Sequence, residues 1–135
     1  MTKIVDNYAV LEEIGSGQYS TVHKGRHVLA GELVAIKVFK LDRLGNNPEI
    51  KELIDEEIRV LRTIDSPYVI KNLKMLKTSH NIYEVYEFCE QGNLYNMLHK
   101  KGSLSEKEAL LIFKDLVSAI KVLYANSSLC IIVQM

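Results

Sequence analysis

A glycine-rich turn near the start of the chain contains residue types that could hold a phosphate group. Gly15 and Gly17 lie in a segment from Gly15 to Ser20 that separates two strand-like stretches, Tyr8–Ile14 and Thr21–Gly25. Glycines have no side chains, so backbone N–H groups in such a turn can approach an anion closely, and phosphate suits a flexible nest of N–H groups. A glycine hairpin with no ligand would show the same pattern. The turn alone therefore leaves both interpretations open.

Two other kinds of phosphate-binding loop do not fit this turn. A dinucleotide-binding fingerprint would open a helix, but no helical spacing of apolar residues follows the glycines. The G-K-[ST] sequence of a Walker loop occurs nowhere in the chain. The pattern predicts the tip of a β-hairpin instead.

The next predicted strand, over residues 32–41, places a lysine among apolar side chains. Alternate residues of a strand point to opposite faces of its sheet, and both faces of this strand are largely apolar around Lys37. A charge in that setting needs a buried partner or an anionic ligand. The alternative is that the Lys37 side chain extends to the edge of the sheet and its ammonium stays in water.

A glutamate in the following segment could be the partner of Lys37. Asn47 and Pro48 predict the start of a helix that runs to about Ile64. Its apolar stripe also contains Glu57, unless that residue only borders the stripe. We expect Lys37 and Glu57 to pair, because each offsets the cost of burying the other. The stripe consists of Ile50, Leu53, Ile54, Ile58 and Leu61.

Together these motifs resemble the small lobe of a eukaryotic protein kinase. The matching residues are Gly15-x-Gly17-x-x-Ser20-x-Val22, then Val34-Ala35-Ile36-Lys37, then Glu57, and the resemblance extends from about Tyr8 to Tyr124. It implies that the glycine-rich loop covers the phosphates of ATP, that Lys37 holds the α- and β-phosphates, and that Glu57 positions Lys37. Lys37 and Glu57 are thus the implied catalytic residues. The one small departure is Ser20, where the family pattern has a third glycine.

The resemblance also implies an adenine pocket. Tyr86 would lie at its back, although simple core packing would also explain an aromatic residue there. The backbone of Glu87 and Cys89 would bond the adenine edge, while Val22 and Ala35 would cover its faces. The complete implied nucleotide site is Ile14, Gly15, Ser16, Gly17, Gln18, Tyr19, Ser20, Val22, Ala35, Lys37, Tyr86, Glu87 and Cys89.

The expected fold class is α+β. Two further strands, Leu73–Lys77 and Ile82–Phe88, complete a five-stranded antiparallel sheet with one long helix. We expect a polar loop over Asp42–Asn47 between the lysine strand and that helix. We expect residues 1–91 to form an ATP-binding small lobe and residues 92–135 to form the truncated start of a helical large lobe. That second part should hold a helix over Asn93–Lys100, and a longer helix that begins at a capping box of Ser105 and Glu108. The residues expected to face inward are Leu94, Met97 and Leu98 on the first helix, and Ala109, Ile112, Phe113, Leu116, Ile120 and Leu123 on the second.

Composition excludes some functions. The formal net charge is zero, 47% of residues are hydrophobic and 25% are charged, so no basic excess indicates nucleic acid as a partner. No signal peptide or membrane-spanning apolar run is present. We therefore expect a cytoplasmic location, with the nucleus as the alternative. The two cysteines, Cys89 and Cys130, lack metal-ligand spacing, so we expect reduced thiols and no metal site.

The sequence lacks two motifs that the resemblance would require for catalysis. Protein kinases transfer the γ-phosphoryl of ATP to a protein hydroxyl, here serine or threonine in preference to tyrosine, and use Mg²⁺ held by residues of the H-R-D-x-x-x-x-N and D-F-G motifs. Neither motif occurs in these 135 residues. We therefore expect this chain by itself to be inactive. The alternatives are a catalytically dead module that binds a nucleotide or a protein partner, and an inert fragment.

The resemblance ends abruptly after Tyr124. Val133 and Gln134 occupy the positions expected for the histidine and arginine of the first missing motif. We expect the last residues to derive from truncation, a frameshift or a retained intron.

Overall fold

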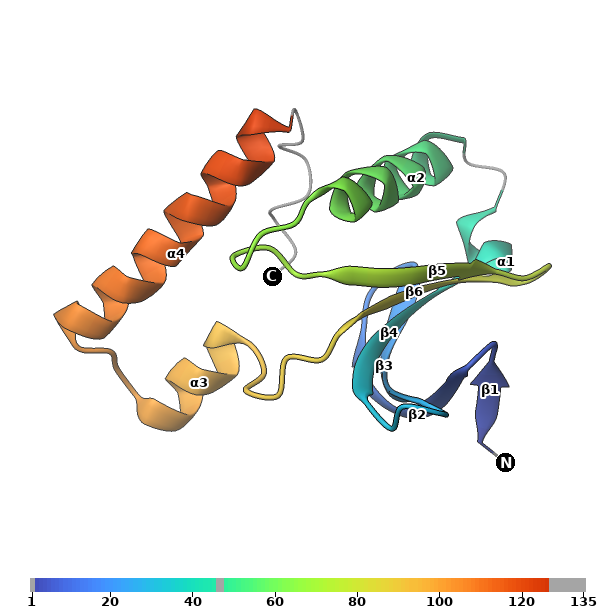
Figure 1. Cartoon of the computed structure of the whole chain (residues 1–135), viewed down its shortest axis with the longest axis horizontal. Helices are drawn as coiled ribbons and strands as arrows, with labels where there is room; N and C mark the ends of the chain where they lie inside the picture. Colours follow the sequence, from blue (N-terminus) through green and yellow to red (C-terminus); the bar gives the residue numbers. More distant parts are fainter. Residues whose placement is uncertain (1, 46–47, 127–135) are drawn as a thin grey trace.

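The fold is a curled antiparallel sheet with one long helix packed across it and two further helices beyond (Figure 1). The computed structural model describes residues 2–45 and 48–126. The strands follow one another across the sheet in the order β1-β2-β3-β4-β6-β5. In chain order the elements are β1 (Lys3–Val5), β2 (Tyr8–Ser16), β3 (Ser20–His27), β4 (Leu33–Lys40), α1 (Leu41–Leu44), α2 (Pro48–Thr63), β5 (Asn72–Lys77), β6 (Asn81–Glu87), α3 (Leu94–Lys101) and α4 (Glu106–Ala125).

The predicted class is confirmed, but the number of strands was wrong. The sheet has six strands, because β1 pairs with β2 from Lys3 opposite Val10 to Val5 opposite Tyr8. A strand of three residues is too short to show an alternating pattern. The tight reversal that follows it uses Asp6 at a φ of 53°, a conformation that aspartate tolerates better than most residues.

The segment after β4 was also predicted differently. The sequence indicated a polar loop over Asp42–Asn47, whereas Leu41–Leu44 form the single-turn helix α1. Leu44 is buried against Phe39 and Ile54. One turn contains too few residues to show a helical period, and the neighbouring polar residues are typical of a loop, so the sequence predicted a loop here. The predicted helix cap at Asn47 lies outside the described residues.

Hydrophobic clusters lie on both faces of β4. On one face its valines and Ile36 pack with Tyr8, Tyr83 and Val85. On the other face Phe39 packs with Ile82 and with α2. This burial on both faces explains why β4 reads as a nearly continuous apolar run. The face covered by α2 is also the one that carries Lys37, because Lys37 and Phe39 are two residues apart in the strand.

Gly25 is required by the packing of the other face. A methyl group at Gly25 would come within 2.4 Å of Ile36 Cδ1 and 3.0 Å of Val34 Cγ2. We expect Gly25→Ala to lower the free energy of unfolding by about 1–2 kcal/mol, because the crowded side chains must leave their preferred rotamers. Urea denaturation measures this loss. Gly15→Ala is the matched control, since the nearest contact there is Val22 Cβ at 3.8 Å. Equal losses in both variants would contradict the packing explanation.

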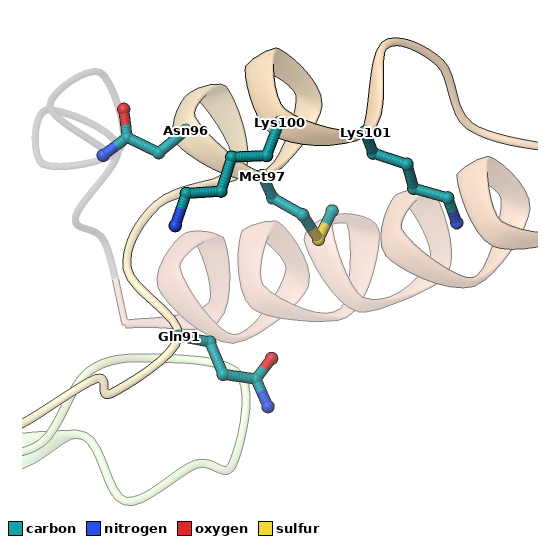
Figure 2. A pocket seen from close by; sticks show the side chains of 5 residues that line it. All are labelled: Gln91, Asn96, Met97, Lys100 and Lys101. Atoms are coloured by element: carbon teal, nitrogen blue, oxygen red, sulfur yellow. The ribbon is translucent and has the colours of Figure 1, made fainter.

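The two predicted helices of the second part are present, but the first does not bury its apolar residues. No residue of α3 is buried, and Leu94 and Met97 are 44% and 36% exposed. Figure 2 shows Met97 beside a pocket that is also lined by Gln91, Asn96, Lys100 and Lys101. Periodicity identifies the apolar face of a helix, but it does not show whether the described chain provides anything to cover that face.

The longer helix α4 packs only near its C-terminal end. Ala119 and Leu123 are buried in a cluster with Val60 and Leu61 of α2 and with Tyr86 of β6. The prediction that the rest of the stripe is buried was wrong for most of its residues: Ile112 is half-buried, and Ala109, Phe113, Leu116 and Ile120 are exposed. In the described part of the chain, neither α4 nor any other helix is long and apolar enough to cross a membrane.

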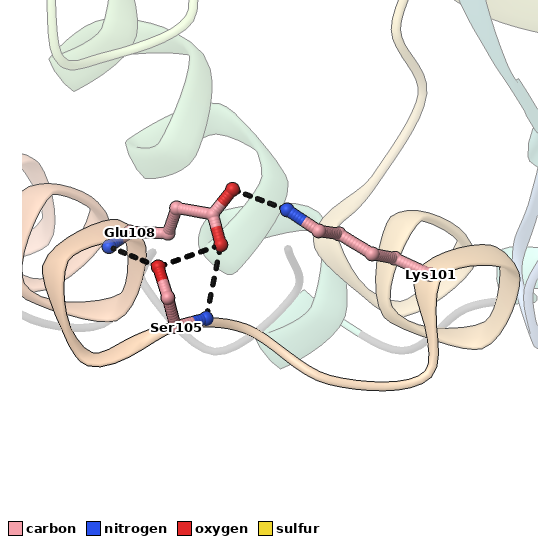
Figure 3. Close-up of polar contacts among 3 residues, drawn as sticks. All are labelled: Lys101, Ser105 and Glu108. Atoms are coloured by element: carbon pink, nitrogen blue, oxygen red, sulfur yellow. Dashed lines mark hydrogen bonds and ion pairs between the residues drawn. The ribbon is translucent and has the colours of Figure 1, made fainter.

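The predicted capping box at the start of α4 is confirmed (Figure 3). The Ser105 hydroxyl accepts a hydrogen bond from the Glu108 backbone N–H at 3.3 Å, and the Glu108 carboxylate accepts one from the Ser105 backbone N–H at 2.9 Å. Lys101 pairs with the same carboxylate. This ion pair, with the Ser105 bonds, lowers the pKa of Glu108 to about 2.

Loss of this cap should weaken the helix. We expect Ser105→Ala to lower the free energy of unfolding by about 1 kcal/mol, because one N–H group at the start of α4 loses its acceptor. Chemical denaturation followed by circular dichroism measures the change. Ser103→Ala, two residues earlier and exposed, should have no effect. A loss confined to Ser103→Ala would contradict the assignment of the cap.

Candidate functional site

Lys37 and Glu57 meet between the sheet and α2. Lys37 Nζ lies 3.3 Å from Glu57 Oε1, close enough for a hydrogen-bonded ion pair. Their side chains are 17% and 27% exposed. This contact confirms the predicted pairing. It rules out a Lys37 side chain that extends to the edge of the sheet. Glu57 is partly exposed, so it borders the apolar stripe and still pairs with Lys37.

The partial exposure of this pair matters for its chemistry. A pair that water can still reach contributes about 1 kcal/mol or less to stability. The Lys37 ammonium also lies 4.8 Å from the centroid of the Phe39 ring, which attracts a cation weakly. The arrangement therefore holds a positive charge in a defined position, while leaving it accessible to an anion.

The glycine-rich hairpin is next to Lys37 in the sheet. Val22 of β3 is the Cα partner of Lys37, and Gly15 of β2 is the Cα partner of Val22. At the tip, the Gly17 N–H donates to the Ser20 carbonyl at 2.8 Å, and Ser16, Gly17 and Gln18 are exposed. The strand register thus connects the turn directly to the lysine.

Neither packing nor backbone conformation requires glycine in this turn. A methyl group at Gly15 or Gly17 would meet other atoms only at 3.7 Å or more, which is ordinary contact. Neither glycine has the positive φ that favours this residue, unlike Gly31 and Gly45. The contacts of the described chain therefore give no reason for glycine at these two positions. Close approach of a ligand is such a reason.

The predicted adenine-binding residues lie at one end of the same sheet. Ala35 of β4 is the Cα partner of Tyr86 on β6, and both pack in the cluster between α2 and α4. Tyr86 is thus a core residue, and it could still close the rear of a pocket. The Ile14 side chain is half exposed, and Tyr19 packs partly against the cluster around Phe39.

The segment after β6 has some of its backbone groups already paired. The Glu87 N–H donates to the Lys71 carbonyl at 3.1 Å, and the Cys89 carbonyl accepts from the Gly92 N–H at 3.1 Å. Cys89 itself is exposed. Partial desolvation and the nearby Glu87 raise the pKa of its thiol. The adenine contacts assigned to Glu87 and Cys89 stay a prediction.

The sequence did not single out Glu84, although it belongs to this region. Glu84 is the Cα partner of Lys37 on β6, and its side chain is completely buried. Burial raises its pKa to about 7, although the hydrogen bond from Tyr86 and the charge of Lys37 oppose that shift. The sequence feature that could have identified Glu84 is a glutamate inside the apolar run of β6, two residues before Tyr86.

Two surface pockets lie away from the Lys37–Glu57 pair. One is the pocket beside α3 (Figure 2). The other is lined by residues of the turn between α2 and β5, together with Lys71 and Glu87. Among residues 2–45 and 48–126, no three His, Cys, Asp or Glu side chains cluster as metal ligands would.

Comparison with known proteins gives a consistent result. The pattern of the protein kinase domain matches residues 8–132, eight residues beyond the predicted limit at Tyr124. Serine/threonine-protein kinase ATG1b from Arabidopsis thaliana is 36% identical over 93% of this chain, and SNF1-related protein kinase catalytic subunit alpha KIN12 from the same plant is 31% identical over 93%. Maternal embryonic leucine zipper kinase from Danio rerio is 33% identical over 93%.

This chain spans only 17%, 25% and 18%, respectively, of the length of those three relatives. Its match nevertheless covers nearly all of its own residues, including the glycine-rich hairpin, the Lys37 strand and the Glu57 helix. The chain therefore belongs to the protein kinase family, and it contains the small lobe of the kinase domain with the first helices of the large lobe.

Proposed function

We propose that this chain binds an adenine nucleotide, with the phosphates at Lys37 and the glycine-rich turn. The observation that carries the proposal is the accessible ion pair of Lys37 and Glu57. Only strand β3 separates Lys37 from the hairpin that contains Gly15 and Gly17, two glycines that no internal contact requires. An ammonium that is fixed by a carboxylate and still reachable can bond to phosphate oxygens without first losing its orientation.

Each residue of the proposed site has a physical role. Lys37 donates hydrogen bonds to the phosphate oxygens, and Glu57 keeps its ammonium in place. The absence of side chains at Gly15 and Gly17 lets backbone N–H groups approach the phosphates. Val22 and Ala35 offer small apolar surfaces to the adenine ring, and the Cys89 backbone lies at the end of β6 where the ring edge would be.

For the whole protein, we propose transfer of the ATP γ-phosphoryl to a serine or threonine hydroxyl of a protein. Magnesium would neutralise charge that develops on the phosphates in that reaction. The 135-residue chain contains neither motif that supplies magnesium ligands and the catalytic base. We therefore propose that this chain alone binds nucleotide without transferring phosphate.

A thermal shift titration and a transfer assay test these two statements. We expect ATP to raise the melting temperature of the chain in a saturable way. With magnesium and radiolabelled ATP, we expect no phosphate transfer to a generic protein substrate above background. No shift at millimolar ATP would contradict nucleotide binding, and turnover that disappears in Lys37→Met would contradict inactivity.

A second candidate function is protein association through α4. Its face carries several exposed apolar side chains, of which Phe113 is 60% exposed, and contiguous exposed apolar surface commonly marks a contact site. We expect the chain to associate with itself at micromolar concentration in sedimentation velocity, and Phe113→Asp to reduce that association. Lys107→Asp, on an exposed position of the same helix, is the control. A monomer at all concentrations would count against this candidate.

A further inference from the structure

A third ionisable side chain lies beside the Lys37–Glu57 pair. Glu84 and Lys37 are direct partners across β6 and β4. Their side chains share the sheet face that α2 covers, since Glu84 is two residues from Ile82 and Tyr86, which both pack on that side. No part of the Glu84 residue is exposed to solvent.

The Glu84 carboxylate is only half satisfied. Tyr86 Oη donates a hydrogen bond to Glu84 Oε2 at 2.6 Å. The other oxygen, Oε1, is buried and has no hydrogen-bond partner in the described part of the chain. An unpartnered buried carboxylate oxygen is costly, so it must either carry a proton or attract a cation.

Among the ionisable side chains described around Glu84, one is a cation, Lys37. Lys37 faces it from β4, Glu57 faces it from α2, and Tyr86 lies on its own strand. Strand β5 contributes Met75 opposite Glu84 and Asn72 opposite Tyr86, neither of which ionises. The Asn72 amide is also buried without a partner in the described residues, so it does not satisfy Glu84 Oε1.

We propose that Glu84 is a positioning residue of the nucleotide site, which competes with Glu57 for the Lys37 ammonium. When Glu84 is neutral, Lys37 pairs with Glu57 alone and remains available to phosphate. When Glu84 is ionised, Lys37 is drawn inward toward β6, and the three side chains together carry one negative charge. This inference deepens the proposed nucleotide binding and rests on it.

The charge balance gives the direction of the effect. Nucleotide phosphates are anionic, so an additional buried negative charge near Lys37 opposes their binding. Both states of Glu84 are populated near neutral pH, since burial raises its pKa to about 7. A leucine or methionine at this position would fill the space without the cost of burying a carboxylate, so packing alone does not explain the residue.

The coupling can be measured without any nucleotide. We would follow the Glu84 carboxyl carbon by ¹³C NMR during a pH titration of the full chain, in the wild type and in Lys37→Met and Glu57→Gln. If Lys37 reaches Glu84, its removal should raise the Glu84 midpoint by about one pH unit, and removal of the Glu57 charge should lower it. An unchanged midpoint in both variants would overturn the proposal.

Nucleotide binding provides the second arm of the test. We would measure the ATP dissociation constant by calorimetry at pH 6 and pH 8 for the wild type, Glu84→Gln and the exposed control Glu52→Gln. When the pH rises from 6 to 8, the affinity of the wild type and of the control for ATP should fall about fivefold more than the affinity of Glu84→Gln does. The nucleotide's own ionisation cancels, because it is the same for all three proteins.

The two arms separate the possible failures. If no protein binds ATP, the proposed function fails, and the NMR midpoints still decide whether Lys37 and Glu84 interact. If all three bind ATP with the same pH dependence, the proposed role of Glu84 is overturned while nucleotide binding stands.

Discussion

Lys37→Met should strongly reduce the stabilisation of this chain by ATP. Methionine is close to lysine in length, but it removes the ammonium that lies 3.3 Å from Glu57 Oε1 and 4.8 Å from the centroid of the Phe39 ring. Hydrogen bonds to charged groups contribute about 1.5–3 kcal/mol each, so loss of one phosphate contact should weaken ATP binding by about tenfold to a hundredfold. Isothermal titration calorimetry measures the change directly.

The same substitution should have little effect on folding. Glu57 is 27% exposed and becomes hydrated when its partner is lost, so the free energy of unfolding should fall by about 1 kcal/mol or less. Lys40→Met is the matched control, because Lys40 is an exposed lysine at the end of the same strand. It should bind ATP as the wild type does. Equal affinities for Lys37→Met and the wild type would show that the nucleotide is held elsewhere.

The Lys37–Glu57 contact could be predicted because each residue was anomalous within a strong pattern. The nearly continuous apolar run of β4 placed Lys37 on a buried face, and the helical period of α2 placed Glu57 on its apolar stripe. Burying two charges of opposite sign on neighbouring elements costs little free energy only when the two charges form an ion pair. Sequence patterns therefore located the centre of the candidate site as well as the elements that position it.

Features that depend on tertiary surroundings could not be predicted in this way. The three residues of β1 and the single turn of α1 are too short to show a period. The exposure of Leu94 and Phe113 depends on what lies next to their helices, and periodicity contains no information about that. Likewise, a single glutamate among apolar residues does not reveal whether its carboxylate reaches water. Complete burial of Glu84 follows from the joint packing of β4, β5 and α2 around β6.

The burial of Glu84 should make stability fall as pH rises through neutrality. Its pKa is raised to about 7 in the folded chain, against 4.5 for an unhindered glutamate, so the folded state binds this proton more tightly than the unfolded state. The resulting stabilisation is complete below pH 4.5 and is lost as the pH rises through 7. A difference of that size corresponds to about 3 kcal/mol of unfolding free energy between pH 4.5 and pH 8.

Glu84→Gln isolates this contribution. Glutamine has nearly the same shape and can still accept the hydrogen bond from Tyr86, but it does not ionise. Urea denaturation from pH 5 to pH 8 should therefore give a falling curve for the wild type and a flatter one for the variant, which should be the more stable protein at pH 8. Glu108 does not interfere in this range, because its lowered pKa affects stability only at more acidic pH. Parallel curves for the two proteins would show that Glu84 does not titrate as a buried carboxylate.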